Sequence, residues 1–303
     1  MYKQKVIIKK SAVLLFILCL TFFGTLCVNN ISNSNKVSAM PFYDLRPKEI
    51  VLRSSFYTTY KSSSDERKNN IAVATKSLNN TLVDVGGEFS FNKTVGPRTE
   101  KNGYKSAKII VGGEFVDGVG GGVCQVSTTL YNAVLLSGLL ITECHPHSLP
   151  VGYIAPSFDA MVNSGSSDLK FINNTHNPII IKTFANGEVL KMEIWGEPQK
   201  EKISRQSVVL GEIPAPIEQE VFDENGEYPE LFEGERIVVR YSKTGLISEG
   251  YLVFSINGKV LRVKKIRSDK YNAQRGLIVW GKAVKDKELN DEDIVEQKDS
   301  FES

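Results

Sequence analysis

Histidine and cysteine are scarce in this 303-residue chain, which narrows the chemistry available to it. The three histidines and four cysteines form no Cys-x-x-Cys or His-x-x-x-His pair, so we expect no metal site. A nucleotide-binding glycine loop and a paired-carboxylate constellation are also lacking, which argues against kinase, metalloprotease and glycosidase activities. Basic residues do not cluster with aromatic ones and the formal net charge is only +2. We therefore expect no cofactor and no nucleic-acid partner.

Residues 1–39 have the pattern of an export segment. Four lysines within the first ten residues precede an uncharged run over 11–28, and Val37-Ser38-Ala39 supplies the small residues of a cleavage site. The run is long for a cleaved signal and barely long enough to span a bilayer, so a cleaved signal peptide and an uncleaved membrane tether both remain open. Either one predicts an extracytoplasmic protein, secreted to the cell wall or anchored to the outer face of the membrane.

The stretch from Gly118 to Ser137 carries the most specific chemical signal. Three glycines, Gly120 to Gly122, lead into Cys124, and apolar residues then recur at helical spacing. Glycines allow positive φ angles and close approach of another molecule. We therefore predict that Cys124 lies at the start of a helix, where free N–H groups and the helix dipole favour a thiolate.

A candidate base follows in the segment Glu143–Ser148. His145 and His147 flank Pro146, which favours an extended or turn conformation, so their side chains point to opposite sides and only one can face Cys124. The residues alone leave a structural interpretation open. Cys124 and Cys144 can instead form a disulfide, or Cys124 can be inert packing at the start of a helix.

Hydrophobic patterning predicts an α+β fold of short strands with two main helices, followed by a small β-rich domain. A first domain is expected over 48–198, a charged linker over 199–206, and a β-rich module over 207–283 without cysteine or histidine, which we interpret as a binding or spacing module. The charged segment 284–303 is predicted to be disordered. The first helix is expected from the capping residues Ser63-Ser64 to about Leu78. The second is expected from Val123 onward, and the apolar pattern of this second helix reaches Ile141. Strands are expected at 50–60, 83–85, 88–92, 107–111, 114–116, 151–154, 160–162, 169–172, 179–184 and 189–195, and in the module at 208–210, 237–241, 251–256, 260–266 and 277–280.

Several motifs in the same order resemble the VanW domain family over residues 50–198. They include Gly87–Asn92, Val95–Arg98, Gly103-Tyr104, Gly120–Ala133, Glu143 with His145–Ser148, Tyr153, and Asp159-Ala160. Some members of this family are cysteine-dependent peptidoglycan L,D-transpeptidases. The second unit is weakly similar to G5-type modules.

The resemblance implies acyl transfer on peptidoglycan stem peptides, with Cys124 as nucleophile and a histidine of the His145/His147 pair as base. His147 is favoured because the His147-Ser148 dipeptide is the steadier part of the family pattern. Asp159 is a candidate to orient the histidine, and N–H groups near Gly121, Gly122 or Gln125 are candidates to bind an oxyanion. The substrate-contact candidates are Gly121, Gly122, Gln125, Ser127, Thr128, Arg98 and Tyr153.

Two alternatives remain open on the sequence. One is a non-catalytic cell-wall-binding accessory protein of the glycopeptide-resistance type, and the other is a thiol carboxypeptidase on wall peptides. Cys144 stands where the family pattern suggests arginine, and an oxidised Cys124–Cys144 pair would silence the site. The oligomeric state is not predicted.

Overall fold

The computed structural model describes residues 49–111 and 114–282. The expected export segment, the turn Gly112-Gly113 and the charged tail 284–303 therefore lie outside the described residues. Within the described ranges, none of the helices combines the length and the apolar character needed to cross a membrane.

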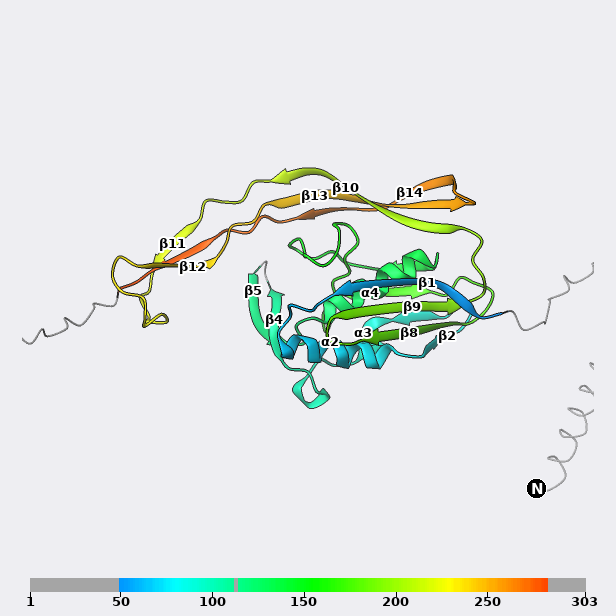
Figure 1. Ribbon diagram of the computed structural model, residues 1–303, viewed down its shortest axis with the longest axis horizontal. Coiled ribbons are helices and arrows are strands. Elements are labelled where there is room, and N and C mark those ends of the chain that lie inside the picture. Colours follow the sequence, from blue (N-terminus) through cyan, green and yellow to red (C-terminus); the bar gives the residue numbers. More distant parts are fainter. Residues whose placement is uncertain (1–48, 112–113, 283–303) are drawn as a thin grey trace, which may run out of the picture. The chain divides into compact units, whose positions relative to one another are not determined.

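A four-stranded antiparallel sheet and two helices form the framework of the first domain. Figure 1 shows α2 and α4 lying along this sheet, whose strand order is β1-β9-β8-β2. The bounds are β1 Val51–Thr59, α2 Asp65–Leu78, β2 Thr81–Val83, α4 Val123–Leu136, β8 Ile179–Ala185 and β9 Val189–Gly196.

Both predicted helices are present, and their apolar stripes are buried. Ser64 caps α2, because its hydroxyl accepts a hydrogen bond from the backbone N–H of Arg67. Ile71, Ala74 and Leu78 on α2 are fully buried, as are Val126, Leu130, Ala133 and Val134 on α4. The 3.6-residue periodicity therefore predicted the core-facing sides of both helices.

Smaller elements surround this framework. A three-stranded sheet has the order β3-β7-β6, and β4 and β5 form an antiparallel pair, as the hairpin pattern predicted. The bounds are β3 Glu88–Ser90, α3 Phe91–Val95, the 3-10 turn η1 Glu100–Asn102, β4 Ser106–Val111, β5 Glu114–Val119, β6 Leu140–Glu143 and β7 Lys170–Ile172.

Three local predictions in this domain are wrong. Phe91-Asn92 begins the short helix α3 instead of continuing a strand, because the Ser90 hydroxyl caps it. The helix α4 ends at Leu136, and the apolar run after it enters strand β6. The segments 151–154 and 160–162 form no strands beyond a single bridge between His145 and Met161. In and just before the second segment, side chains of α4 bind the backbone of Phe158 and Ala160 instead.

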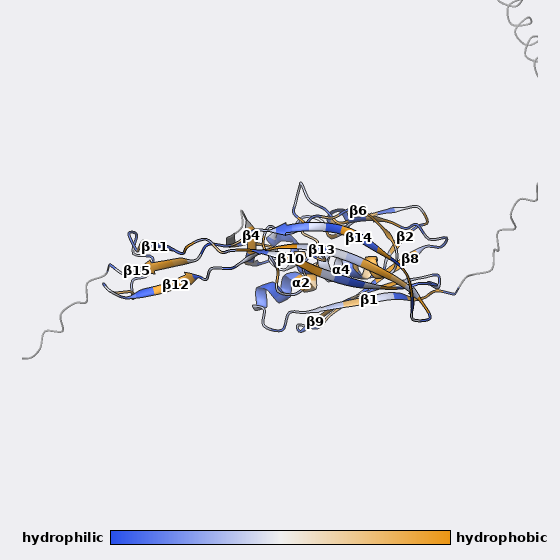
Figure 2. Cartoon of the chain, turned by 90° about the horizontal axis from the view of Figure 1, so that it is seen from above, coloured by the Kyte–Doolittle hydropathy of each residue, from blue (hydrophilic) through white to orange (hydrophobic). Residues whose placement is uncertain are grey.

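Two further sheets make up the C-terminal part. One has the order β10-β13-β14 and the other the order β11-β15-β12, in which β11 runs parallel to β15. The strand β15 is hydrophobic along its length (Figure 2). The bounds are β10 Lys202–Ile213, β11 Gln219–Phe222, β12 Arg236–Arg240, β13 Gly245–Ile256, β14 Lys259–Tyr271 and β15 Leu277–Trp280.

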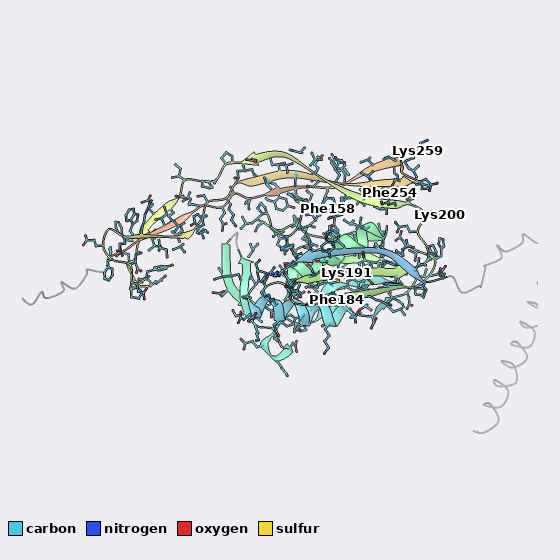
Figure 3. All side chains as sticks on the ribbon, in the orientation of Figure 1. Phe158, Phe184, Lys191, Lys200, Phe254 and Lys259 are labelled. Carbon is cyan, nitrogen blue, oxygen red and sulfur yellow. The ribbon has the colours of Figure 1, made fainter. Side chains whose placement is uncertain are left out.

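The predicted linker over 199–206 is largely strand. β10 starts at Lys202, and Ile203 is buried in the same hydrophobic cluster as Leu130 and Val134 of α4. Phe254 of β13, labelled in Figure 3, belongs to this cluster too. Ile203 is the single apolar residue of 199–206, and the inward-facing Arg205 lies over the Phe56 and Phe158 rings. The composition of the segment therefore suggested a linker, although alternate residues face the core.

The described residues therefore have an α+β fold, as predicted. Three α-helices occur within the described ranges, and their neighbours are mostly antiparallel strands. The first sheet of the C-terminal part shares a core with the first domain, which places its strands against the elements that carry the predicted site.

Candidate functional site

The glycine loop is shaped by close contacts at the start of α4. Gly122 caps the helix with a φ of 106°, a conformation that favours glycine. A Cβ at Gly121 would lie 2.7 Å from the Lys108 carbonyl oxygen of β4. Asn70 of α2 donates from Nδ2 to the Gly121 carbonyl oxygen at 3.0 Å. These contacts fix the loop and place Cys124 at the second residue of the helix, as predicted.

Cys124, His147 and Asp159 lie together. His147 Nδ1 is 2.7 Å from Asp159 Oδ2, which also accepts the backbone N–H of His147 at 2.6 Å. The imidazole and the Cys124 thiol are close enough for each to shift the pKa of the other. The Cys124 thiol donates to the Val162 carbonyl oxygen at 3.3 Å. A thiol, an imidazole and a carboxylate thus form one cluster, in which a hydrogen bond joins the imidazole to the carboxylate.

The electrostatics of this cluster favour a thiolate–imidazolium pair. Burial by itself raises the pKa of Cys124, but the hydrogen bond and charge of His147 outweigh it and hold that pKa below its usual value. Burial opposes the charged imidazole too, yet Asp159 and Cys124 raise the pKa of His147 to about 9. Asp159 is only 1% exposed, and despite that burial His147 and Arg267 lower its pKa to about 2. An ionised cysteine beside a charged histidine is the arrangement of an activated nucleophile.

Two arginines contribute positive charge near Cys124. Arg98 is partly buried and donates to Ser164 Oγ at 3.2 Å and to Asn92 Oδ1 at 2.5 Å. Burial lowers its pKa, while the negative charge of Cys124 opposes that change. Burial also lowers the pKa of Arg67 of α2, a residue that the sequence did not single out, and the opposing charges are those of Tyr153 first and then Cys124.

Three other predicted contact residues serve the interior of the domain. The Gln125 amide is buried, donates to Thr58 Oγ1 and the Thr59 carbonyl oxygen, and accepts from Arg67 Nη2 at 2.8 Å. Ser127 Oγ donates to the Ala160 carbonyl oxygen at 2.6 Å, and Thr128 Oγ1 accepts the Ala160 N–H at 2.9 Å. Ser127 and Thr128 therefore hold the backbone beside Asp159.

Tyr153 is a partly buried neighbour of Cys124. Its pKa is raised first by burial and then by the negative charge of Cys124.

His145 faces away from Asp159, whereas the Cys144 thiol donates to the Asp159 backbone carbonyl oxygen at 3.7 Å and accepts from Arg267 Nη1 at 3.3 Å. His145 lies on the opposite side of the strand-like segment, with Nε2 3.0 Å from Glu143 Oε1, in agreement with the alternation expected around Pro146. Cys144 and Cys124 are both free thiols. Burial is the main cause that raises the pKa of Cys144 to about 12, so it stays a neutral thiol.

Sequence reasoning missed two residues on β14. Arg267 Nη2 donates to Asp159 Oδ1 at 2.7 Å, and Tyr271 OH donates to the same oxygen at 2.6 Å. The strand pattern of 259–271 did not mark Arg267 or Tyr271 as site residues, because several lysines and arginines occur along this strand and the sequence does not show which of them is buried. Only the docking of β14 against the Asp159 segment distinguishes Arg267 from the neighbouring lysines.

The described ranges contain no group of three histidine, cysteine or acidic side chains placed to hold a metal ion. Most polar side chains of the site are paired, while Arg98 Nε is buried without a hydrogen-bond partner among the described residues.

The site lies in an α+β domain, with Cys124, His147 and Asp159 gathered at a glycine-capped helix. Residues 66–195 match the family described as VanW like protein, so the resemblance seen in the sequence is confirmed over this VanW-like segment.

Two curated relatives share similarity with this chain. It is 46% identical over 127 residues to "Uncharacterized protein YoaR" of Bacillus subtilis, a match that covers 42% of each chain. It is 27% identical over 139 residues to "Vancomycin B-type resistance protein VanW" of Enterococcus faecalis, covering 44% of this chain and 50% of the relative. The matches thus span half or less of the length of these relatives.

A solved structure titled "IgA1 Protease G5 domain structure" also resembles part of the chain. It is 18% identical, covers 29% of this chain and all of that domain, and has a TM-score of 0.17. Its title names the kind of module to which the second unit is weakly similar in sequence, and a TM-score this low adds nothing about the fold of that unit.

Proposed function

We propose that this protein is a cysteine-dependent acyltransferase of the L,D-transpeptidase type, acting on peptidoglycan stem peptides outside the cytoplasm. The observation that carries the proposal is the cluster of Cys124, His147 and Asp159, in which Asp159 binds His147 and the interaction of His147 with Cys124 favours the thiolate–imidazolium state. The similarity of the VanW-like domain to a vancomycin-resistance protein supports a role at the cell wall. The apolar, lysine-preceded N-terminal segment supports export.

In the first step, the Cys124 thiolate attacks the carbonyl carbon of the third stem residue. The negative charge that develops on the carbonyl oxygen is stabilised by N–H groups at the start of α4. The N–H of Gln125 already donates to the Gly122 carbonyl oxygen at 3.0 Å, so we assign this role to the Cys124 N–H. The His147 imidazolium then protonates the departing amine, the C–N bond breaks, and the terminal D-amino acid leaves behind a thioester on Cys124.

In the second step, an amine of a neighbouring stem peptide attacks the thioester. Neutral His147 accepts the amine proton, the C–S bond breaks, and a new amide cross-link forms as the thiolate–imidazolium pair is restored. Asp159 keeps Nδ1 of His147 protonated in both steps, so the other ring nitrogen exchanges the proton with Cys124 and the substrate.

The direct test is incubation of the reduced full-length chain with disaccharide-tetrapeptide, with products followed by mass spectrometry. We expect release of the terminal residue together with a cross-linked dimer, and loss of both in Cys124→Ala. Monomeric tripeptide alone would instead identify a carboxypeptidase. Unaltered substrate, with binding to purified sacculi that survives Cys124→Ala, would identify a non-catalytic wall-binding protein.

The two histidines supply a matched pair of variants. We expect His147→Gln to lose turnover to about the level of Cys124→Ala, because members of such a unit do not act additively. His145→Gln removes an imidazole of the same size two residues away, whose partner is Glu143. Because His145 contacts Glu143, we expect His145→Gln to retain turnover within about threefold of wild type. That change is less than about 1 kcal/mol in the activation barrier, since a tenfold change corresponds to about 1.4 kcal/mol.

A further inference from the structure

Asp159 is held by two side chains that do not belong to the VanW-like segment. One of its oxygens, Oδ2, serves His147, and the other, Oδ1, accepts hydrogen bonds from Arg267 Nη2 at 2.7 Å and Tyr271 OH at 2.6 Å. Arg267 also donates from Nη1 to the Asp159 backbone carbonyl oxygen at 2.6 Å. Both side chains come from β14, beyond residue 195 where the family match ends.

The two holding side chains are themselves fixed. Arg267 Nε donates to Asp269 Oδ2 at 2.6 Å, and the side chain is only 13% exposed. Tyr271 is fully buried, and its hydroxyl also accepts the backbone N–H of Ser157 at 2.7 Å. The planar guanidinium of Arg267 binds both the carboxylate and the backbone carbonyl of Asp159. This two-point contact prevents rotation of the Asp159 carboxyl group. The second oxygen therefore stays directed at His147.

We propose that Arg267 and Tyr271 are positioning residues for the Cys124–His147–Asp159 site, so that the second β-rich unit completes this site and is more than a binding or spacing module. The proposal rests on the proposed function for its catalytic meaning. In structural terms, the proposal is that β14 sets the orientation of the Asp159 carboxylate, and that this carboxylate sets the orientation of the His147 imidazole.

The charges around the site give this positioning a measurable consequence. The charged and titratable groups around Cys124 are His147, Arg98, Arg67 and Tyr153. Those around Asp159 are His147, Arg267, Tyr271, Tyr153 and Cys144. If the carboxylate turns away, the imidazolium loses its anionic partner, and the thiolate forms only at higher pH. The arginines near Cys124 are unaffected by changes on β14.

The experiment measures the alkylation rate of Cys124 by iodoacetamide from pH 5 to 9 in the reduced full-length chain. Cleavage after Glu143 separates the Cys124 peptide from the Cys144 peptide, so mass spectrometry reports each thiol separately. The variants are Tyr271→Phe, which removes one hydroxyl, and Arg267→Lys, which keeps the charge but loses the two-pronged contact. Loss of an outer partner of a functional histidine costs on the order of 10- to 100-fold at metal sites. We expect alkylation at pH 7 to fall at least about tenfold by the same reasoning, with the pH midpoint moved upward.

Matched substitutions on the same sheet serve as controls. Tyr251→Phe removes a hydroxyl that contacts Glu249, and Arg262→Lys removes a two-pronged contact to Glu201. Neither touches Asp159, so both should leave the rate and the midpoint at wild-type values. Thermal unfolding is recorded for every variant, and if one of the two test variants fails to fold, the other decides.

The outcomes separate this inference from the proposed function, because alkylation requires no wall substrate. A reactive Cys124 whose rate and midpoint are unchanged in Tyr271→Phe and Arg267→Lys would overturn the positioning role and leave the transpeptidase proposal standing. A reactive Cys124 that responds to both variants but forms no cross-link supports the positioning role and counts against the transpeptidase. A wild-type Cys124 that reacts no faster than Cys144 would refute both.

Discussion

Replacing Asp159 by Asn tests the central electrostatic interaction of the site. The substitution keeps the shape of the side chain but removes the charge that balances Arg267 and His147. Arg267 would then be left as a largely buried cation whose remaining carboxylate partner is Asp269. Breaking a buried ion pair by removing one partner typically destabilises a protein by about 3–5 kcal/mol, and we expect Asp159→Asn to lose that much free energy of unfolding at pH 7.

The pKa of Asp159 gives an independent magnitude and a sign. Its fall from 3.8 to about 2 in the folded protein corresponds to about 2 kcal/mol, since one pKa unit is about 1.4 kcal/mol. A carboxyl group with a depressed pKa contributes stability above its unfolded pKa and loses it as the pH falls through the folded value. The difference in stability between wild type and Asp159→Asn should therefore shrink by about 2 kcal/mol as the pH is lowered from 4 toward 2.

Urea unfolding followed by circular dichroism measures both quantities. Asp117→Asn is the control, because the Asp117–Lys108 pair lies on the surface with both side chains mostly exposed, and such pairs contribute only about 0–1 kcal/mol. Adding Arg267→Met to Asp159→Asn should recover part of the loss, since the unbalanced cation is then gone. A loss below about 1 kcal/mol in Asp159→Asn, equal to that of the control, would refute the view that a buried charge network holds the site.

Two further predictions concern pH and the glycine loop. Turnover should follow a bell-shaped pH profile whose basic limb lies near pH 9. Above the raised pKa of His147, the imidazole has no proton to give to the leaving amine. A profile that stays flat to pH 10 would contradict this assignment. Gly122→Ala should destabilise the protein by about 1–3 kcal/mol, because a side chain at φ 106° is strained and its Cβ would lie 3.0 Å from Arg67 Cγ and Ile71 Cγ1. Gly187→Ala, at φ 92° with no atom near its Cβ, should carry the backbone strain alone, and an equal loss in both would exclude the contact with α2.

The parts of the site that could be predicted from sequence are those set by local rules. A run of glycines before an apolar helical pattern placed Cys124 at the start of α4, and the residues around Pro146 separated His145 from His147. Both predictions depend only on the periodicity of a neighbouring segment. Asp159 was a candidate only through the family resemblance, since nothing in its neighbours marks it.

The remaining features depend on contacts between distant segments. The segment 157–162 was predicted in part to be a strand, but Ser127, Thr128 and Asn132 of α4 bind its backbone instead. A side chain that satisfies a backbone group replaces the strand partner that hydrophobic patterning presupposes. Arg267 and Tyr271 were missed because their importance follows from contacts of β14 with Asp159, more than 100 residues away, and not from their own neighbours in sequence.

The holding of Asp159 by β14 also bears on what similarity in the VanW-like segment can convey. The matched residues 66–195 contain the thiol, the imidazole and the carboxylate, but the two groups that orient the carboxylate lie some 70 residues beyond the match. Ile203 of β10 and Phe254 of β13 are buried in the core of the first domain, and both strands belong to the sheet that contains β14. The orientation of the Asp159 carboxylate therefore depends on the packing of this sheet against the first domain. A chain with the same segment and a different C-terminal part would need another pair of donors to hold its carboxylate. We therefore expect the reactivity of Cys124 to depend on both parts of this chain together.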